Sequence, residues 1–447
     1  MGNSSLYLST KLVDKNIPMY NKSLYIPFAI AFAIPSISFA QGQKAESIVH
    51  ADAQAHKNQN QKSAAFSPNG NWRGVFKIKP DLDIPFNFEI KDKDGLKKLY
   101  FRNAEESFEG GVIKQTADSI FVKIDQFDNE LALGINGNIL NGSLRKQNGT
   151  GKATQISAEK KDYRFEPNGK AAAGNYSGSY DVIFKSPDGK EEKTVGLFKQ
   201  TGNKITGTFL RVTGDSRYLE GTVQGNEFQL SAFIGSSPSY YKGKFESDGT
   251  LTGEILSARG SQPFTGVKNK DAALPDAYKL TYLKEGYKTL DFSLPDVNGK
   301  KISLKDDKYK NKVVVLTITG SWCPNCIDEA GFIAPWYKEN KKRGVEVIAL
   351  HYERQTDAEY AKKALTNFRN RFGIEYDQVI AGKADKQAVA ESLPALNSFV
   401  SFPTTIFIDK SGNVAKIHTG YNGPATGKFY DEFVKEFNSE IDELLKK

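Results

Sequence analysis

The stretch VVVLTITGSWCPNC, residues Val313 to Cys326, decides the fold of the C-terminal part of the chain. Its first half is an apolar, β-branched run typical of a buried strand. Gly320 and Ser321 then end the strand, and the residues that follow can continue as a helix. This order places Cys323 at a helix N-terminus, where free backbone N–H groups and the helix dipole favour an anion. We therefore expect Cys323 to react as a thiolate.

The chain of 447 residues contains only two cysteines, Cys323 and Cys326. If Cys323 is the N-cap, Pro324 takes the first helical position, where its missing N–H costs nothing, and the amides of Asn325 and Cys326 can donate to sulfur. Structural zinc usually needs four Cys or His ligands, and the sequence has no second Cys-x-x-Cys pair. A purely structural disulfide closing so short a loop adds little stability. We interpret the pair as a redox-active dithiol that needs no metal and no cofactor.

Two further motifs frame this pair: LDFSLPDVNGKKISL at Leu290–Leu304 and FPTTIFID at Phe402–Asp409. With the Trp-Cys-Pro-Asn-Cys site, they make residues 287–447 resemble the thioredoxin superfamily and, within it, the redoxin-type TlpA-like thiol-disulfide reductases of bacterial envelopes. The resemblance implies an α/β thioredoxin-like domain and a thiol-disulfide oxidoreductase activity. It also implies a periplasmic or other extracytoplasmic envelope compartment, and a role in cell redox homeostasis.

The resemblance implies functions for residues around the two cysteines. Pro403 matches the catalytic cis-proline, and Phe402 precedes it in a loop that would hold an extended substrate by backbone hydrogen bonds. Trp322, Pro324 and Asn325 would complete the substrate-binding surface. Without the resemblance, Pro403 would be assigned to an ordinary trans turn.

Glu329 lies three residues after Cys326, so on a helix it shares a face with that cysteine. It matches the catalytic acidic residue of the family. A partly desolvated carboxylate there would have a raised pKa and could exchange a proton with Cys326. The alternative is a solvated helix glutamate, since most glutamates are exposed. Asp328 is expected at the surface.

The expected reaction is attack of Cys323 on the disulfide of an envelope protein, followed by resolution of the mixed disulfide by Cys326. Because no third cysteine can recycle the pair, the resemblance suggests a membrane-bound dithiol donor as a second partner. The residues do not fix whether the reaction runs as reduction or oxidation. A peroxiredoxin-like peroxidase, with antioxidant activity, is a rival, but its motif wants Thr and Pro where Gly320 and Leu316 stand.

Residues 1–40 resemble a secretory signal peptide, with Lys22, an apolar run and a small-residue cleavage pattern ending at Ala40. Translation could start at Met19. The apolar run is short and holds Pro27 and Pro35, which argues against a membrane anchor. Residues 41–67 are polar and lack apolar periodicity, so they are interpreted as a flexible spacer. The net charge is +8, but the basic residues are interleaved with acidic residues, and the sequence has no nucleic-acid-binding motif.

Residues 68–268 carry short alternating strands and turn signals, which predicts an antiparallel all-β region, a barrel or a sandwich, as one domain or two repeated ones. Gly70-Asn71-Trp72-Arg73-Gly74 is echoed by Gly174-Asn175-Tyr176-Ser177-Gly178, and turns at Gly137, Gly202 and Gly249 each lead into a strand with a close-approach glycine. The region resembles the lipocalin-like β segments of some envelope proteins. It could therefore bind a small ligand or a surface partner, which makes a ligand-binding protein with an accessory redox domain the alternative function.

Trp72, Tyr240 and Tyr241 could line a binding mouth, although such residues are more often core. Residues 269–286 are interpreted as a linker. Beyond the active-site helix we expect a strand at Val345–Leu350, a helix at Asp357–Arg371, a long crossover over residues 352–400, a turn at Ser411–Asn413 and a final helix at Thr426–Leu445.

Overall fold

The computed structural model describes residues 66–447 of the chain. The predicted signal peptide, the start at Met19 and nearly all of the predicted spacer lie outside the described residues. The described residues belong to one compact unit, Ala64–Lys447. Between residues 66 and 447, no helix has both the length and the apolar character that a membrane crossing requires.

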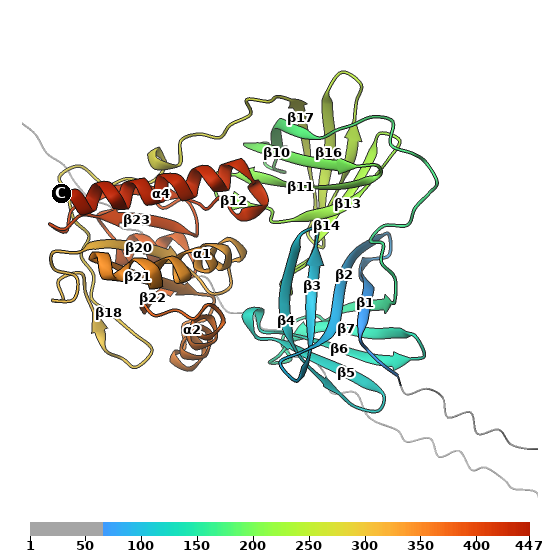
Figure 1. Ribbon diagram of the computed structural model, residues 1–447, viewed down its shortest axis with the longest axis horizontal. Helices are drawn as coiled ribbons and strands as arrows, with labels where there is room; N and C mark the ends of the chain where they lie inside the picture. The colour runs from blue at the N-terminus through green and yellow to red at the C-terminus, as the bar shows by residue number, and fades with distance from the viewer. Residues whose placement is uncertain (1–65) are drawn as a thin grey trace, which may run out of the picture. The chain divides into compact units, whose positions relative to one another are not determined.

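The first eight strands form a closed antiparallel barrel (Figure 1). Each strand pairs with the next along the chain, and β1 pairs with β8 to close the ring. A 3-10 turn, η1, Asp125–Phe127, connects β5 to β6. The strands are β1 Gly70–Lys79, β2 Leu82–Lys93, β3 Leu96–Asn103, β4 Glu106–Gln115, β5 Ser119–Ile124, β6 Asn129–Asn136, β7 Ile139–Lys146 and β8 Thr154–Glu159.

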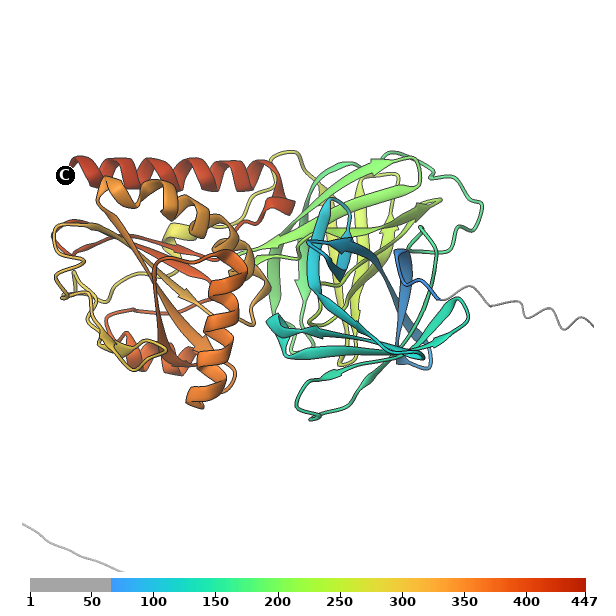
Figure 2. The same cartoon turned by 60° about the horizontal axis from the view of Figure 1, so that its bottom comes forward.

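A second barrel of eight strands follows, coloured green to yellow in Figure 2. The pairing of β10 with β11 closes it. The additional two-residue strand β12, Gly214–Asp215, pairs only with the end of β11. The all-β prediction is therefore confirmed, as two closed barrels. The barrel strands are β9 Gly178–Lys185, β10 Glu191–Thr201, β11 Lys204–Arg211, β13 Leu219–Gln224, β14 Glu227–Ala232, β15 Ser239–Phe245, β16 Thr250–Ser257 and β17 Gly260–Lys268.

Aromatic side chains fill the barrels because alternate residues of each strand point inward. In the second barrel, the rings of Phe228 and Phe245 lie 4.8 Å apart. In the first barrel, the ring of Phe233, which comes from the segment after β14, lies 4.7 Å from the rings of both Phe76 and Phe101. One barrel therefore contributes a side chain to the core of the other.

The proposed binding-mouth residues are core residues. Trp72 is fully buried and donates its indole N–H to the carbonyl of Pro68 at 2.7 Å. Tyr240 and Tyr241 are also buried, and the hydroxyl of Tyr240 donates to the side chain of Gln229. Trp72 and Tyr241 therefore stabilise the barrels, whereas Tyr240 also lines a cavity of about 560 Å³ on the second barrel.

The turn-and-strand repeats noticed in the sequence are hairpins. Gly137, Gly202 and Gly249 have positive φ values of 59°, 57° and 87°. In the strands that follow, a Cβ atom on Gly142, Gly207 or Gly253 would lie 2.0, 2.3 or 2.5 Å from a carbonyl oxygen of the neighbouring strand. The other echo is less regular, because Trp72 lies within β1 whereas Tyr176 precedes β9.

The C-terminal domain is a five-stranded sheet in the order β22-β21-β20-β23-β24. β20 runs parallel to β21 and antiparallel to β23. A short hairpin, β18 and β19, and the 3-10 turn η2 precede this sheet, and η3 and η4 lie within the domain. The elements are η2 Ala277–Lys279, β18 Leu294–Pro295, β19 Lys301–Ile302, β20 Val313–Thr319, α1 Pro324–Asn340, η3 Lys341–Arg343, β21 Val345–Glu353, α2 Ala358–Phe372, β22 Asp377–Lys383, α3 Lys386–Ser392, β23 Thr404–Ile408, β24 Val414–Thr419, η4 Pro424–Thr426 and α4 Lys428–Lys446.

All residues of the central strand β20 are buried, because successive side chains point to opposite faces of the sheet and both faces are covered. Val313 and Val315 pack in the cluster that includes α1 and α4, whereas Val314 and Leu316 pack in the cluster that includes α3. The predicted elements after α1 are confirmed. Asp357 is the N-cap of α2, and the last helix begins two residues later than expected. The fold is thus the predicted thioredoxin-like α/β domain after an all-β region.

Candidate active site

The first turn of α1 forms around the sulfur of Cys323. This cysteine is the N-cap, with extended backbone angles of φ −90° and ψ 122°, and Pro324 takes the first helical position. The amide of Cys326 donates to the Cys323 sulfur at 3.4 Å. Both cysteines are free and buried. The local geometry is the one that the residue pattern predicts.

Cys326 and Glu329 lie together inside the domain. Cys326 is fully buried, and burial together with the adjacent Cys323 raises the pKa of its thiol well above the usual value. Glu329 is 2% exposed and accepts a hydrogen bond of 2.6 Å from the hydroxyl of Thr405. Burial raises the pKa of Glu329 to about 8, although this hydrogen bond acts in the opposite direction. The solvated alternative for Glu329 is therefore wrong.

The loop before β23 faces Cys323. The Phe402–Pro403 peptide bond is cis, and the sulfur of Cys323 lies 3.7 Å from the carbonyl oxygen of Phe402. Half-buried Phe402 contacts the ring of Trp322, with centroids 5.7 Å apart. The indole N–H of Trp322 in turn donates to the carbonyl of Tyr352 at 2.9 Å. All the residues assigned to the site from the sequence thus lie at the N-terminus of α1 or on the loop opposite it.

Glu353, which the sequence analysis missed, fixes the turn that leads into the redox pair. It is fully buried at the end of β21 and accepts hydrogen bonds from the amide and the hydroxyl of Ser321, at 2.8 and 2.7 Å. His351 lies 3.4 Å from the same carboxylate. The sequence did contain a signal for this role, because Glu353 is a charged residue at the end of the apolar strand β21, which pairs with β20.

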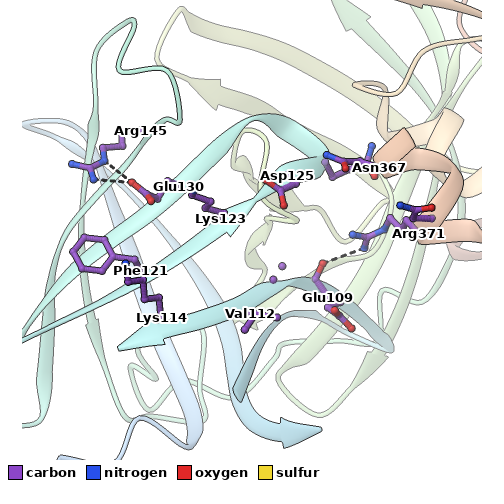
Figure 3. Close-up of a pocket in the computed structure, with 14 residues that line it drawn as sticks. Glu109, Val112, Lys114, Phe121, Lys123, Asp125, Glu130, Arg145, Asn367 and Arg371 are labelled. Atoms are coloured by element: carbon purple, nitrogen blue, oxygen red, sulfur yellow. Dashed lines mark hydrogen bonds and ion pairs between the residues drawn. The ribbon is translucent and has the colours of Figure 1, made fainter. Parts of the chain in front are cut away.

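The first barrel also contacts this turn. The side-chain amide of Gln126, in η1, donates to the carbonyl of Ser321 at 2.5 Å. Gln126 also lines a cleft of about 900 Å³ between the outer face of the barrel and α2. In Figure 3, Arg145 pairs with Glu130 on the barrel strands, and Arg371 of α2 approaches the backbone of Glu109. The cleft carries charges of both signs and so favours neither anions nor cations.

Asp328 is not the surface residue that the sequence suggested. Its side chain is 15% exposed and lies 2.5 Å from the guanidinium of Arg217, which belongs to the second barrel. Burial raises the pKa of Asp328 to about 7, against the opposing effect of Arg217. Sequence alone could not show this pairing because the two residues lie in different domains. Within the described part of the chain, no group of three or more Cys, His, Asp or Glu residues is arranged to hold a metal ion.

The fold and the site define a thioredoxin-like domain with a Cys-x-x-Cys pair at the start of its first helix. Residues 286–417 match the model of the AhpC/TSA family. The chain is 34% identical over 139 residues to thiol-disulfide oxidoreductase ResA of Bacillus subtilis (strain 168), an alignment that covers 31% of this chain and 69% of the relative. It is 34% identical over 131 residues to ResA of Bacillus thuringiensis (strain Al Hakam), covering 29% of this chain and 67% of that one.

Among solved structures, a thiol:disulfide interchange protein from Chlorobium tepidum TLS is 22% identical with a TM-score of 0.28, covering 36% of this chain and 98% of that one. A DsbF homologue from Corynebacterium diphtheriae is also 22% identical, with a TM-score of 0.28, covering 37% of this chain and 97% of that one. From the extent of its similarity to ResA, the chain belongs to the ResA family of thiol-disulfide oxidoreductases.

Proposed function

We propose that the protein reduces disulfides of partner proteins in an extracytoplasmic compartment through Cys323 and Cys326. The observation that carries the proposal is the position of Cys323, which caps α1 and whose sulfur accepts a hydrogen bond from the amide of Cys326. The membership in the ResA family supports the same reaction. The predicted signal peptide supports export.

Cys323 is the attacking group in this proposal, since the thiol of Cys326 is the more buried and has a raised pKa. The Cys323 thiolate forms a mixed disulfide with one partner sulfur and expels the other as a thiolate. Cys326 then attacks the Cys323 sulfur, which releases the second partner thiol. The partner gains two electrons and two protons, and the Cys323–Cys326 pair becomes a disulfide. A dithiol donor in the same compartment must reduce it again.

Glu329 is proposed as the proton acceptor for Cys326. Its raised pKa keeps it close to the protonation equilibrium at neutral pH, which suits a group that takes a proton in one step and returns it later. Trp322, Pro324, Asn325 and Phe402, with Pro403, are proposed to contact the substrate chain. Their support is the position of the Phe402 carbonyl beside the Cys323 sulfur.

The packing around Gly320 supports dithiol exchange over the peroxidase alternative. A Cβ atom on Gly320 would lie 2.5 Å from the indole nitrogen of Trp322 and 2.8 Å from the carbonyl oxygen of Tyr352. The threonine that the peroxidase motif needs at this position would clash with both groups. The ligand-binding alternative gains no support from Trp72 or Tyr241, which are buried.

Replacing each cysteine with serine tests the proposal. Cys323→Ser should abolish reduction of insulin disulfides. Cys326→Ser should retain the attack and accumulate a mixed disulfide with the partner, visible as a mass adduct that a reductant removes. Insulin reduction by the Cys323→Ser protein at the wild-type rate would refute the proposal.

A further inference from the structure

A hairpin of the second barrel lies directly against the redox site. It comprises the end of β11, a turn at Val212–Thr213, the short strand β12 and the residues up to Arg217, and we call residues 210–217 the β11–β12 hairpin. Leu210 pairs with Asp215 and Arg211 with Gly214, so the hairpin is a regular ladder that ends in a tight turn. Both the barrel and the redox domain belong to the same compact unit.

The main chain of the hairpin touches the residues that flank Cys323. The hydroxyl of Ser401 donates to the carbonyl of Thr213 at 3.0 Å. Gly214 has a φ of 127°, which favours glycine, and a Cβ atom there would lie 2.0 Å from the side-chain nitrogen of Asn325. A Cβ atom on Gly420 would lie 2.5 Å from the carbonyl oxygen of Val212. The hairpin thus contacts one residue of the redox motif, the residue Ser401 before β23 and the residue Gly420 after β24, which lie at the same end of this antiparallel pair.

Arg217 fastens the hairpin to the redox helix. It is 9% exposed, has a left-handed backbone with φ of 56°, and donates to the carbonyl of Pro324 at 2.9 Å. Its guanidinium also pairs with Asp328 of α1 and with Glu106 of the first barrel. Asp215 completes the cluster, because its carboxylate accepts hydrogen bonds from the amides of Gly423 and Arg217, at 2.7 and 2.6 Å. The guanidinium of Arg217 therefore connects the two barrels and the redox domain, and it lies among the carboxylates of Glu106, Asp215 and Asp328.

The redox site leaves little free surface for a substrate. Cys323 is only 6% exposed. In the proposed function, a protein substrate needs the surface beside Asn325 and the Pro403 loop as well as the sulfur. The hairpin occupies part of that surface, whereas a small disulfide needs contact with the sulfur alone.

We propose that the β11–β12 hairpin determines the substrate specificity of the redox site, with Arg217 as the positioning residue that holds it in place. Protein disulfides must displace the hairpin before they react, and small disulfides need not. The inference rests on the proposed function, because it assigns the covered surface to substrate binding. Removing Arg217 leaves the carboxylates of Glu106, Asp215 and Asp328 together without a cation, which favours release of the hairpin.

Arg217→Ala tests the inference in the full-length protein. The reduced enzyme is mixed, in single turnover, with insulin as the protein disulfide or with dithiobis(nitrobenzoic acid) as the small one, and the ratio of the two rates is measured. We expect this ratio to rise about tenfold in Arg217→Ala, because the fraction of molecules with an accessible surface increases. Arg145→Ala, which removes an exposed guanidinium paired with Glu130, is the matched control and should leave the ratio unchanged.

An unchanged ratio in Arg217→Ala, with a melting curve that shows a folded protein, would overturn the inference. A second measurement needs no change at Arg217. Hydrogen exchange of the amide of Gly423, which donates to Asp215, should accelerate when the Cys326→Ser protein carries a mixed disulfide with a protein partner; unchanged exchange would also overturn the inference. If wild-type protein fails to react even with the small disulfide, the proposed function itself is wrong, so the two failures are distinguishable.

Discussion

At the scale of single residues, two groups of the redox site depend on different causes. The backbone of α1 determines the position of Cys323, and burial determines the protonation of Glu329. The position of Cys323 follows from its neighbours in the sequence, since a residue before Pro324 and a helical run becomes an N-cap. The state of Glu329 follows from its surroundings, because nothing beside it in the chain predicts that it is 2% exposed. The first property could be derived from the sequence, whereas the second needed the family resemblance.

The protonation of Glu329 makes the stability of the protein depend on pH. Burial raises its pKa from 4.5 to about 8, so the folded state holds a proton that the unfolded chain loses across this interval. The free energy of unfolding should therefore fall as pH rises from 5 to 7.5. Glu329→Gln cannot titrate and should lose about 1–3 kcal/mol less than wild type over that range. Urea unfolding of the reduced proteins at the two pH values measures the difference.

Glu339→Gln is the control for this prediction, because Glu339 is an exposed glutamate on the same helix. Its pH dependence should match that of wild type. Parallel pH profiles for wild type and Glu329→Gln would contradict the raised pKa of Glu329, on which its proposed proton exchange with Cys326 rests.

At the scale of elements, glycines fix how closely the barrel strands approach. A Cβ atom on Gly207 of β11 would lie 2.3 Å from the carbonyl oxygen of Leu197 and 2.7 Å from the ring of Phe198. Gly207→Ala should therefore destabilise the protein by roughly 1–3 kcal/mol, as overpacking of a filled interior does. A lowered urea midpoint for unfolding of the second barrel is the expected signal.

Gly202→Asn provides the comparison at the turn before β11. Its φ of 57° suits asparagine, and a Cβ atom there meets nothing within 4 Å. This change should alter stability by less than about 0.5 kcal/mol, the usual range for surface substitutions. A loss for Gly202→Asn as large as that for Gly207→Ala would show that the glycines serve the turn and not the close approach of strands.

The elements also show how far sequence could predict the fold. Strand β20 follows from its apolar, β-branched run and the start of α1 from the residues around Cys323, whereas the barrel strands follow from their alternating pattern, and the turn glycines mark the hairpins. Closure of the strands into two barrels could not be derived, because it depends on pairings such as β1 with β8 between distant segments. The resemblance to lipocalin-like segments does not distinguish these two small barrels from one larger one.

At the scale of the whole molecule, the barrels and the redox domain are connected by side chains that look ordinary in the sequence. Phe233 and Arg217 lie near the turns of the second barrel, where exposed residues are expected, yet both are buried against another domain. No periodicity or motif in the sequence predicts these contacts between domains. For this reason the cysteines could be identified from sequence, and the hairpin that contacts Pro324 and Asn325 could not.

Phe233 should be important for the joint between the two barrels. It is 1% exposed, and its ring lies among those of Phe76, Phe86 and Phe101. Phe233→Ala should cost about 3–5 kcal/mol, as for other buried phenylalanines. Phe121→Ala, at a half-buried position that lines the cleft in Figure 3, should cost clearly less. Equal urea midpoints for the two variants would contradict this account of the joint.

The central claim is that Cys323 and Cys326 form a reversible dithiol–disulfide couple. Equilibration of the whole protein in dithiothreitol buffers of graded potential, followed by acid quenching, alkylation and mass spectrometry, tests this claim directly. We expect a single two-electron transition in which both cysteines change together and which reverses on reduction. Failure of the pair to oxidise to an internal disulfide at any potential, or oxidation that buffer thiols cannot reverse, would contradict the claim.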